Sequence, residues 1–333
     1  MSAKQAAKRK RKNKKKSTND IFRCVFVIVM LLSMLLFANE HWFHLDFIPT
    51  LTDIYKMTGV IKRPNVVVEQ DEIAVHFLDV GQADCIFIYT PDKTMLIDSG
   101  ENDTSQYVIS YLRDFGVKRL DYVIGTHQHS DHMGAMAEIL RAFEVGEFIM
   151  PEIPEEQIPA AAFYSAMLDV IENKGISASY SENGREITLC EGTVLKLLGP
   201  VGDNYEDLND YSIVAKLTSG NFSFLFTGDM EKIAEQQLLM TFPDIKADVL
   251  KVAHHGSASS SCTEFLLAVQ PRYAVISAGR NNSYGHPSNE VLERLCMFNC
   301  TNLVTMNYGD IVFVTDGNEL TYTTTRYGES EAA

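Results

Sequence analysis

The sequence predicts an α/β protein in which two β/α halves pack their sheets face to face with helices outside, preceded by a single N-terminal transmembrane helix. Short apolar runs, each ended by turn or polar residues, recur between residues 73 and 325, and stretches of helical period separate many of them. Histidines and aspartates gather directly after several of these runs. The helix is predicted from an 18-residue apolar run, 21–38, that follows a strongly basic segment.

The composition is that of an ordinary globular protein, with 46% hydrophobic and 22% charged residues among 333. Residues 1–23 hold ten Lys or Arg and one acid, which leaves the remainder with 19 basic and 43 acidic residues, a net charge of −24. Tight non-specific binding to nucleic acid requires Lys and Arg to neutralise phosphates, so this acidic part of the chain is not suited to it. A local groove lined by basic residues is the alternative that remains. The six cysteines have no zinc-ribbon spacing, and we expect no disulfide.

The N-terminal region is predicted to place the protein in the cell membrane as a single-pass protein. Residues 1–20 read as a basic cytoplasmic tail and residues 21–38 as an uncleaved signal anchor, with the catalytic part extracytoplasmic because Lys and Arg collect on the cytoplasmic side. A cleaved signal peptide is the alternative, but Leu36 is a poor match to the small residue expected at a cleavage site. Residues 39–72 are expected to form a stalk or linker, and residues 73–333 the folded domain.

Residues 73–173 predict the first β/α half. Its expected elements are strands at 73–80, 85–89 and 94–98 in an antiparallel meander, helix 105–115, strand 120–125, helix 133–140, strand 147–151 and helix 155–173. The second half repeats this alternation of strands and helices. Its expected elements are a strand or hairpin at 187–198, strands at 212–217, 222–226, 248–253 and 273–277, helices at 231–240, 262–269 and 289–297, and alternating strands at 302–324.

The stretch 126–132, Thr-His-Gln-His-Ser-Asp-His, predicts a metal centre, because it places four candidate ligands in six residues at the end of a strand. His127 and His129 are expected to face one metal, and Asp131 and His132 a second metal about 3.5–4 Å away. His and Asp ligands suit zinc or a similar first-row ion. A polar surface turn is the alternative, but a turn has no need for this order of residues.

Four later residues also follow predicted strands. Asp229 is a candidate bridging carboxylate, with a helix N-cap as its alternative role. His286, in a Gly-His-Pro turn, is a candidate ligand of the second metal, or else a solvent-facing histidine. Either His254 or His255 can be a ligand or a catalytic proton donor, and we favour His255; the alternative is that it only orients a ligand.

These residues resemble a known family. The pattern His-x-His-x-Asp-His at 127–132, Thr-Gly-Asp at 227–229 and a late His286 resemble the metallo-β-lactamase superfamily. The segments 77–84, 96–100, 251–257 and 284–287 resemble, more narrowly, the hydrolase domain of ComEC-type competence proteins. That resemblance implies an αβ/βα four-layer sandwich with the site at the edge between the sheets. It also implies the following metal ligands: His127, His129, Asp131, His132 and Asp229.

One departure from the superfamily concerns the region between His132 and Asp229, which contains no histidine where most members have one. Asp207, Asn209, Asp210 and Ser212 occupy it, as polar residues do in ComEC-like sequences. One metal is therefore expected to be held more weakly, or to be manganese. The expected cofactors are two divalent ions, Zn²⁺ or Mn²⁺.

The predicted function is a membrane-anchored metal-dependent hydrolase that uses a metal-activated water, which Asp131 helps to hold. The ComEC resemblance favours a phosphodiesterase or nuclease-like enzyme, and the acidic body favours a small phosphodiester or a short nucleic-acid strand over long duplex. No protein partner is inferable. An ester, lactone or β-lactam hydrolase on the same site is the open alternative. A binding protein with an inert fold is a further one, which the retained ligands disfavour.

Overall fold

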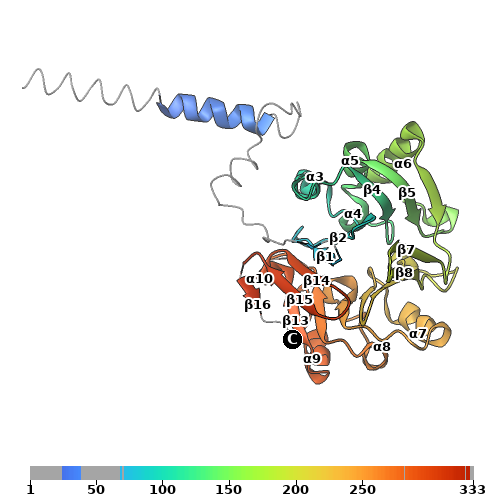
Figure 1. Cartoon of the computed structure of the whole chain (residues 1–333). Helices are drawn as coiled ribbons and strands as arrows, with labels where there is room; N and C mark the ends of the chain where they lie inside the picture. The colour runs from blue at the N-terminus through green and yellow to red at the C-terminus, as the bar shows by residue number, and fades with distance from the viewer. Residues whose placement is uncertain (1–24, 39–67, 70, 281, 327, 331–333) are drawn as a thin grey trace, which may run out of the picture. The chain divides into compact units, whose positions relative to one another are not determined.

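The structure, a computed structural model, describes residues 25–38, 68–69, 71–280, 282–326 and 328–330 (Figure 1). The chain divides into two compact units, residues 1–62 and 63–333. Within the first unit, residues 25–38 form a helix, while residues 21–24 of the predicted anchor and the whole predicted tail lie outside the described residues. Among the described helices, none is both long enough and apolar enough to span a membrane. Most of the predicted stalk also lies outside the described residues.

The second unit is built on two β-sheets. The first has nine strands, in the order β16 (Gly328–Ser330), β15 (Leu320–Thr324), β14 (Ile311–Thr315), β1 (Ile73–Phe77), β2 (Ile86–Tyr89), β3 (Thr94–Ile97), β4 (Arg119–Ile124), β5 (Glu144–Met150) and β6 (Ser177–Tyr180). The second has seven, in the order β13 (Thr301–Val304), β12 (Tyr273–Ile276), β11 (Val249–Lys251), β10 (Phe222–Phe226), β9 (Ala215–Ser219), β8 (Thr193–Leu197) and β7 (Glu186–Cys190).

Helices and short 3-10 turns connect these strands. The α-helices are α3 (Ser105–Asp114), α4 (Ser130–Met133), α5 (Met136–Ala142), α6 (Ala162–Lys174), α7 (Lys232–Thr241), α8 (Thr263–Val269), α9 (Asn289–Met297) and α10 (Thr305–Tyr308). The 3-10 turns are η2 (Asn102–Thr104), η3 (Glu155–Gln157), η4 (Leu208–Tyr211) and η5 (Ala253–Gly256).

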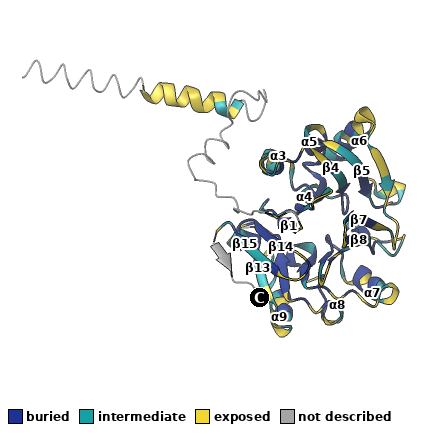
Figure 2. Cartoon of the chain, in the orientation of Figure 1, coloured by how far each residue is buried: buried dark blue, intermediate teal, exposed yellow. Residues whose placement is uncertain are grey.

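The two sheets pack face to face, as predicted. Side chains alternate between the faces of a strand, so one face of each sheet can enter a shared core. That core contains Phe77 from the first sheet and Phe224 from the second, both fully buried. Helices α3, α5 and α6 cover the outer face of the first sheet, and α7, α8 and α9 that of the second. Figure 2 shows the buried residues along these layers, which confirms the αβ/βα sandwich.

Two predicted helices differ from the structure. The helix predicted at 155–173 begins only at Ala162, after the separate turn Glu155–Gln157. Pro159 explains the late start, because proline has no N–H to donate and disfavours helical backbone in the residue before it. The helix predicted at 133–140 is divided into α4 and α5, with Gly134 and Ala135 between them.

The last strands of the chain do not all belong to the second sheet. Strand β13 lies in the second sheet, but β14 and β15 form an antiparallel pair that joins the first sheet, where Val75 of β1 faces Phe313 of β14. The meander β1–β2–β3 is antiparallel as predicted. Beyond it, β3, β4 and β5 run parallel, as do β10, β11 and β12. The carboxyl ends of parallel strands meet at one edge of a sheet, which is where the predicted polar residues follow.

Candidate metal centre

The turn after β4 delivers His132 to the site. His132 lies in α4 and is fully buried, with Nδ1 2.7 Å from Oδ2 of Asp98. Because the carboxylate accepts, the Nδ1 atom carries the proton and the opposite nitrogen, Nε2, is free to bind elsewhere. Nε2 lies 3.2 Å from Oδ1 of Asp229. The Asp98 carboxylate therefore orients the imidazole so that Nε2 is the nitrogen presented to the site.

Asp98, which follows β3, organises this turn. Its two carboxylate oxygens accept hydrogen bonds from the backbone N–H of Thr126 at 2.8 Å and from the Thr126 hydroxyl at 2.7 Å. Its backbone has a positive φ of 59°, a conformation that aspartate tolerates better than most residues. Asp98 was not among the predicted site residues, although it is the last residue of a predicted strand, and that position was the signal.

Asp229 is positioned by the tight turn after β10. Its backbone N–H donates to the Ser212 hydroxyl at 2.9 Å. The preceding Gly228 has a φ of +51°, and a Cβ atom there would lie 2.8 Å from Ser212 Oγ, so glycine is required both sterically and conformationally. The Asp229 side chain is thus directed to the site by a turn that requires glycine at position 228.

His254 and His255 separate into two environments. Both have left-handed backbone, with φ of 50° and 51°, a strained conformation that is found mostly at functional positions. His255 is buried, its Nδ1 donates to the Ser277 carbonyl at 2.9 Å, and its Nε2 lies 3.2 Å from Asp131 Oδ2. His254 is partly exposed and its Nδ1 lies 3.1 Å from Glu231 Oε1. Strain at consecutive residues thus turns one imidazole inward and the other to the rim.

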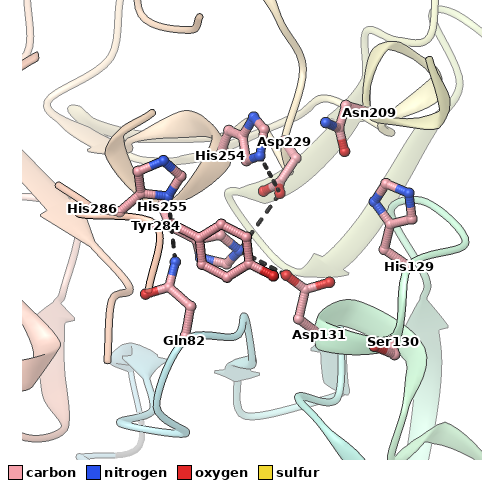
Figure 3. A pocket seen from close by; sticks show the side chains of 10 residues that line it. All are labelled: Gln82, His129, Ser130, Asp131, Asn209, Asp229, His254, His255, Tyr284 and His286. Atoms are coloured by element: carbon pink, nitrogen blue, oxygen red, sulfur yellow. Dashed lines mark hydrogen bonds and ion pairs between the residues drawn. The ribbon is translucent and has the colours of Figure 1, made fainter. Parts of the chain in front are cut away.

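Four side chains converge closely enough to hold a metal ion. We call Asp131, His132, Asp229 and His255 the Asp/His cluster: one ligand atom from each lies within 4.8 Å of all the others. His255 Nε2 is 3.5 Å from Asp229 Oδ2, which closes the group. Figure 3 shows Asp131, Asp229 and His255 pointing toward one another.

The other predicted ligands lie beside the Asp/His cluster. Nε2 of His127 is 3.0 Å from Nδ1 of His129, and the ring of His127 lies 4.1 Å from that of His132 between centroids. His286 is farther out: its ring centroid is 5.6 Å from that of His254, and its Nδ1 is 3.4 Å from Nε2 of Gln82. The structure therefore groups His127 and His129 with the buried cluster and places His286 on the outer side.

A pocket of about 320 Å³ opens onto the cluster. It is lined by residues from both halves of the chain: Gln82, His129, Ser130, Asp131, Asn209, Asp229, His254, His255, Tyr284 and His286 (Figure 3).

The charges in the cluster favour a bound cation. Burial alone would lower the pKa of His132, but the carboxylates of Asp229 and Asp98 outweigh it and raise that pKa well above the ordinary value. Burial alone would raise the pKa of Asp229, but His132 and His255 hold it well below the usual range. Burial, followed by the neighbouring His132, lowers the pKa of His127 and keeps its imidazole neutral. The ionised Asp229 and the neutral His127 are therefore in the forms that bind metals, whereas His132 would give up a proton to an incoming ion.

Two buried atoms supply a direct test of fit for a metal. Nε2 of His132 and Oδ1 of Asp229 face each other at 3.2 Å, and neither atom has a further hydrogen-bond partner among the described residues. Buried polar atoms usually find their full set of partners, so two such atoms facing each other with no other partner are expected where an ion can bind between them. Imidazole nitrogen and carboxylate oxygen together match a first-row divalent ion.

Comparison with known proteins identifies the family of this chain. Residues 78–280 match the family described as the metallo-beta-lactamase superfamily. The chain belongs to that superfamily. It is a metal-dependent hydrolase by fold, with the Asp/His cluster as its candidate metal-binding group.

Among the relatives of this superfamily member are competence proteins. The chain is 32% identical to ComE operon protein 3 of Bacillus subtilis over 244 residues, covering 66% of this chain and 30% of that protein. It is 29% identical to competence protein ComA of Neisseria gonorrhoeae over 241 residues, covering 72% and 32% respectively. The chain thus spans about a third of the length of these relatives. A solved structure, the metallo-beta-lactamase fold protein YhfI from Bacillus subtilis, is similar at 11% identity and a TM-score of 0.45, covering 70% of this chain and 95% of YhfI.

Other residues around the Asp/His cluster were not predicted as site residues. Lys251 and Asp84 form a buried ion pair behind His255, with Nζ 2.6 Å from Oδ2. Asn209 lines the pocket and leaves its buried Oδ1 without a hydrogen-bond partner among the described residues. Asp84 and Lys251 stand inside the segments that carried the family resemblance, but only the tertiary structure pairs them.

Proposed function

We propose that the protein is a phosphodiesterase of nuclease type. The observation that carries the proposal is the pocket itself: the buried Asp229 and His255 of the Asp/His cluster lie at its floor, and the partly exposed imidazoles of His254 and His286 stand at its rim. Rim imidazoles offer N–H donors to the anionic oxygens of a phosphodiester, while the floor favours a cation. The similarity to proteins named for competence supports a nucleic-acid-related role.

The proposed cofactors are two divalent ions, Zn²⁺ or Mn²⁺. The Asp/His cluster would hold one, and His127 and His129 would hold the other with Asp229 shared between them. When bound, a divalent ion supplies Lewis-acid activation of water and neutralises developing negative charge. These roles use the nitrogens that the hydrogen bonds from His132 to Asp98 and from His255 to Ser277 leave free.

The neighbouring side chains would position the reactants. Asp131 is 28% exposed at its side chain and faces the pocket, so it can orient the attacking water. His254 turns Nδ1 toward Glu231, which leaves Nε2 for the substrate, 3.9 Å from Asp229 Oδ2. We therefore assign His255 to metal binding and His254 to the phosphoryl group or leaving group.

Turnover of bis(p-nitrophenyl) phosphate tests the proposal. The full chain would be loaded with zinc or manganese and compared with Asp229→Ala, which removes the shared carboxylate, and with Asp169→Ala, which removes an exposed carboxylate on α6. We expect metal-dependent turnover, reduced by at least about 100-fold in Asp229→Ala, since even residues that only support a ligand are worth 10- to 100-fold. Asp169→Ala should match the wild type.

A parallel assay separates the competing enzyme class. Metal-dependent opening of a chromogenic β-lactam or hydrolysis of p-nitrophenyl acetate, without phosphodiester turnover, would move the assignment to carbon–oxygen or carbon–nitrogen bonds. Metal binding with no turnover of any of these substrates would favour a binding protein.

The membrane location is part of the proposal. Its support is the sequence, in which basic residues precede the apolar run 21–38. We propose a single-pass anchor with the N-terminus in the cytoplasm and the metallohydrolase domain outside the cell membrane. Fractionation of cells should recover the full-length chain with membranes, whereas a shorter form in the medium would refute the anchor.

A further inference from the structure

An exposed aromatic side chain stands at the rim of the pocket. Tyr284 is 72% exposed, although it lines the same pocket as the Asp/His cluster. Its position beside the catalytic groups makes it a surface for ligand binding, because an exposed ring on a pocket offers apolar area that only a ligand can cover. Figure 3 shows the Tyr284 ring in front of the cluster.

The ring is held in a defined orientation. It lies nearly parallel to the imidazole of His286, at an interplanar angle of 24° and 5.7 Å between centroids. Asn282 fixes the backbone of His286: its Oδ1 accepts from the His286 N–H at 3.0 Å, and its Nδ2 donates to the His286 carbonyl at 2.6 Å. The same Nδ2 donates to the Gly279 carbonyl at 2.9 Å. These bonds tie the segment carrying Tyr284 and His286 to the end of β12.

The size and charge of the surroundings limit what can bind there. A pocket of about 320 Å³ is near the lower end of the range that encloses a small ligand, so it suits one nucleotide-sized unit. The net charge of −24 beyond residue 23 disfavours a long polyanionic duplex. A single base, unstacked from its neighbours, presents a flat face that an aromatic ring can cover without sequence preference.

We propose that Tyr284 is a stacking platform for a nucleobase adjacent to the scissile phosphodiester. The inference rests on the proposed phosphodiesterase function and adds its specificity-determining residue. The base stacks on Tyr284 while its phosphate lies toward His254 and the floor of the pocket. The enzyme therefore prefers phosphodiesters that carry a free base over the same backbone without one.

The test compares two ligands that differ only in the base. One is the dinucleotide of thymidine; the other has the same sugar–phosphate backbone with abasic sugars. Each would be assayed with the metal-loaded full chain and with three variants. Tyr284→Ala removes the ring, Tyr284→Phe retains it without the hydroxyl, and Tyr180→Ala removes another exposed tyrosine, on β6.

Stacking on an aromatic side chain is worth about 5- to 150-fold per base, so Tyr284→Ala should lower kcat/KM on the dinucleotide by that factor, mainly through KM. The same variant should leave the abasic ligand within about twofold of the wild type, and Tyr284→Phe should restore the dinucleotide rate. Tyr180→Ala should keep the wild-type rates on both ligands, including the preference for the dinucleotide. Equal losses on both ligands, no loss on either, or failure of Tyr284→Phe to restore the rate would overturn the stacking role.

Two further measurements keep this inference separate from the proposed function. The dissociation constants of both ligands would be measured by titration calorimetry. Base-dependent binding that Tyr284→Ala abolishes, without turnover, would support the stacking role and reject phosphodiesterase activity. Turnover that does not depend on the base would support phosphodiesterase activity and reject the stacking role. Faster cleavage of a duplex oligonucleotide than of its single strand would also contradict an unstacked base.

Discussion

The buried pair of Lys251 and Asp84 should be a major source of stability for the metal centre. Lys251 ends β11, and its side chain is fully buried, while that of Asp84 is 1% exposed. The other carboxylate oxygen of Asp84 lies 3.5 Å from Nδ1 of His255, and the Asp84 backbone N–H donates to the Asp131 carbonyl at 3.0 Å. The pair therefore connects two members of the Asp/His cluster to the core of the second sheet.

Lys251→Met removes the positive charge and keeps an unbranched side chain. The Asp84 carboxylate is then buried without its cation, and breaking a buried pair in this way costs about 3–5 kcal/mol. For a domain of this size, roughly 2 °C of melting temperature corresponds to each kcal/mol, so we expect a fall of about 6–10 °C. Lys246→Met, at an exposed lysine, is the matched control and should shift the melting temperature by less than about 1 °C.

Asp84→Asn and the double variant Asp84→Asn/Lys251→Met complete the cycle. Because the double variant leaves no unpaired charge, its loss should be smaller than the sum of the single losses by at least about 2 kcal/mol. Denaturant unfolding in the presence of a chelator would measure these values without a contribution from metal binding. A loss below 1 kcal/mol in Lys251→Met, or additive single losses, would refute the reasoning.

Three other changes test separate parts of the structure. Burial lowers the pKa of His76 to about 3, so below pH 6.5 the unfolded chain binds a proton at this residue that the folded chain does not. Because of this group, the free energy of unfolding should fall by about 2 kcal/mol between pH 7.5 and pH 5. His76→Gln should remove that share of the acid loss in pH-dependent unfolding, and an unchanged pH profile would contradict it. Zinc at 100 times its Kd should stabilise the wild type by about 2.7 kcal/mol, a gain that melting curves of Asp229→Ala should lack; an equal gain would place the ion elsewhere. Gly134→Ala should cost about 1–3 kcal/mol, because a methyl group there would overlap the Ser130 carbonyl oxygen; a wild-type melting temperature would show that the turn can shift.

The positions of most strands could be predicted because their signals are local. A short apolar run with turn residues at its ends indicates a strand that enters a core, as the run of β10 before Thr227 and Gly228 does. The same reliance on local pattern gave the wrong helix start at 155–173, because the helical period continues across Pro159 although proline disfavours the interior of a helix. The pairing of β14 with β1 carries no local signal, since the two strands lie more than 200 residues apart.

The candidate site shows the same division. Strand-end His and Asp residues indicated a metal centre, since strand ends are rigid and these side chains have few other reasons to gather. His254 and His255 are identical in type and adjacent in sequence, so the sequence could not separate their environments. Their left-handed backbone, held between β11 and Ser277, turns His255 inward and leaves His254 at the rim.

The sequence by itself determined the superfamily, the strands and the set of candidate ligands, because residue type and local period are properties of short segments. Only the tertiary structure decided which nitrogens face one another, that Asp98 holds His132, and that Lys251 neutralises Asp84 in the core. It also placed Tyr284 over the pocket. These relations join segments tens to hundreds of residues apart, so they depend on how the two sheets pack.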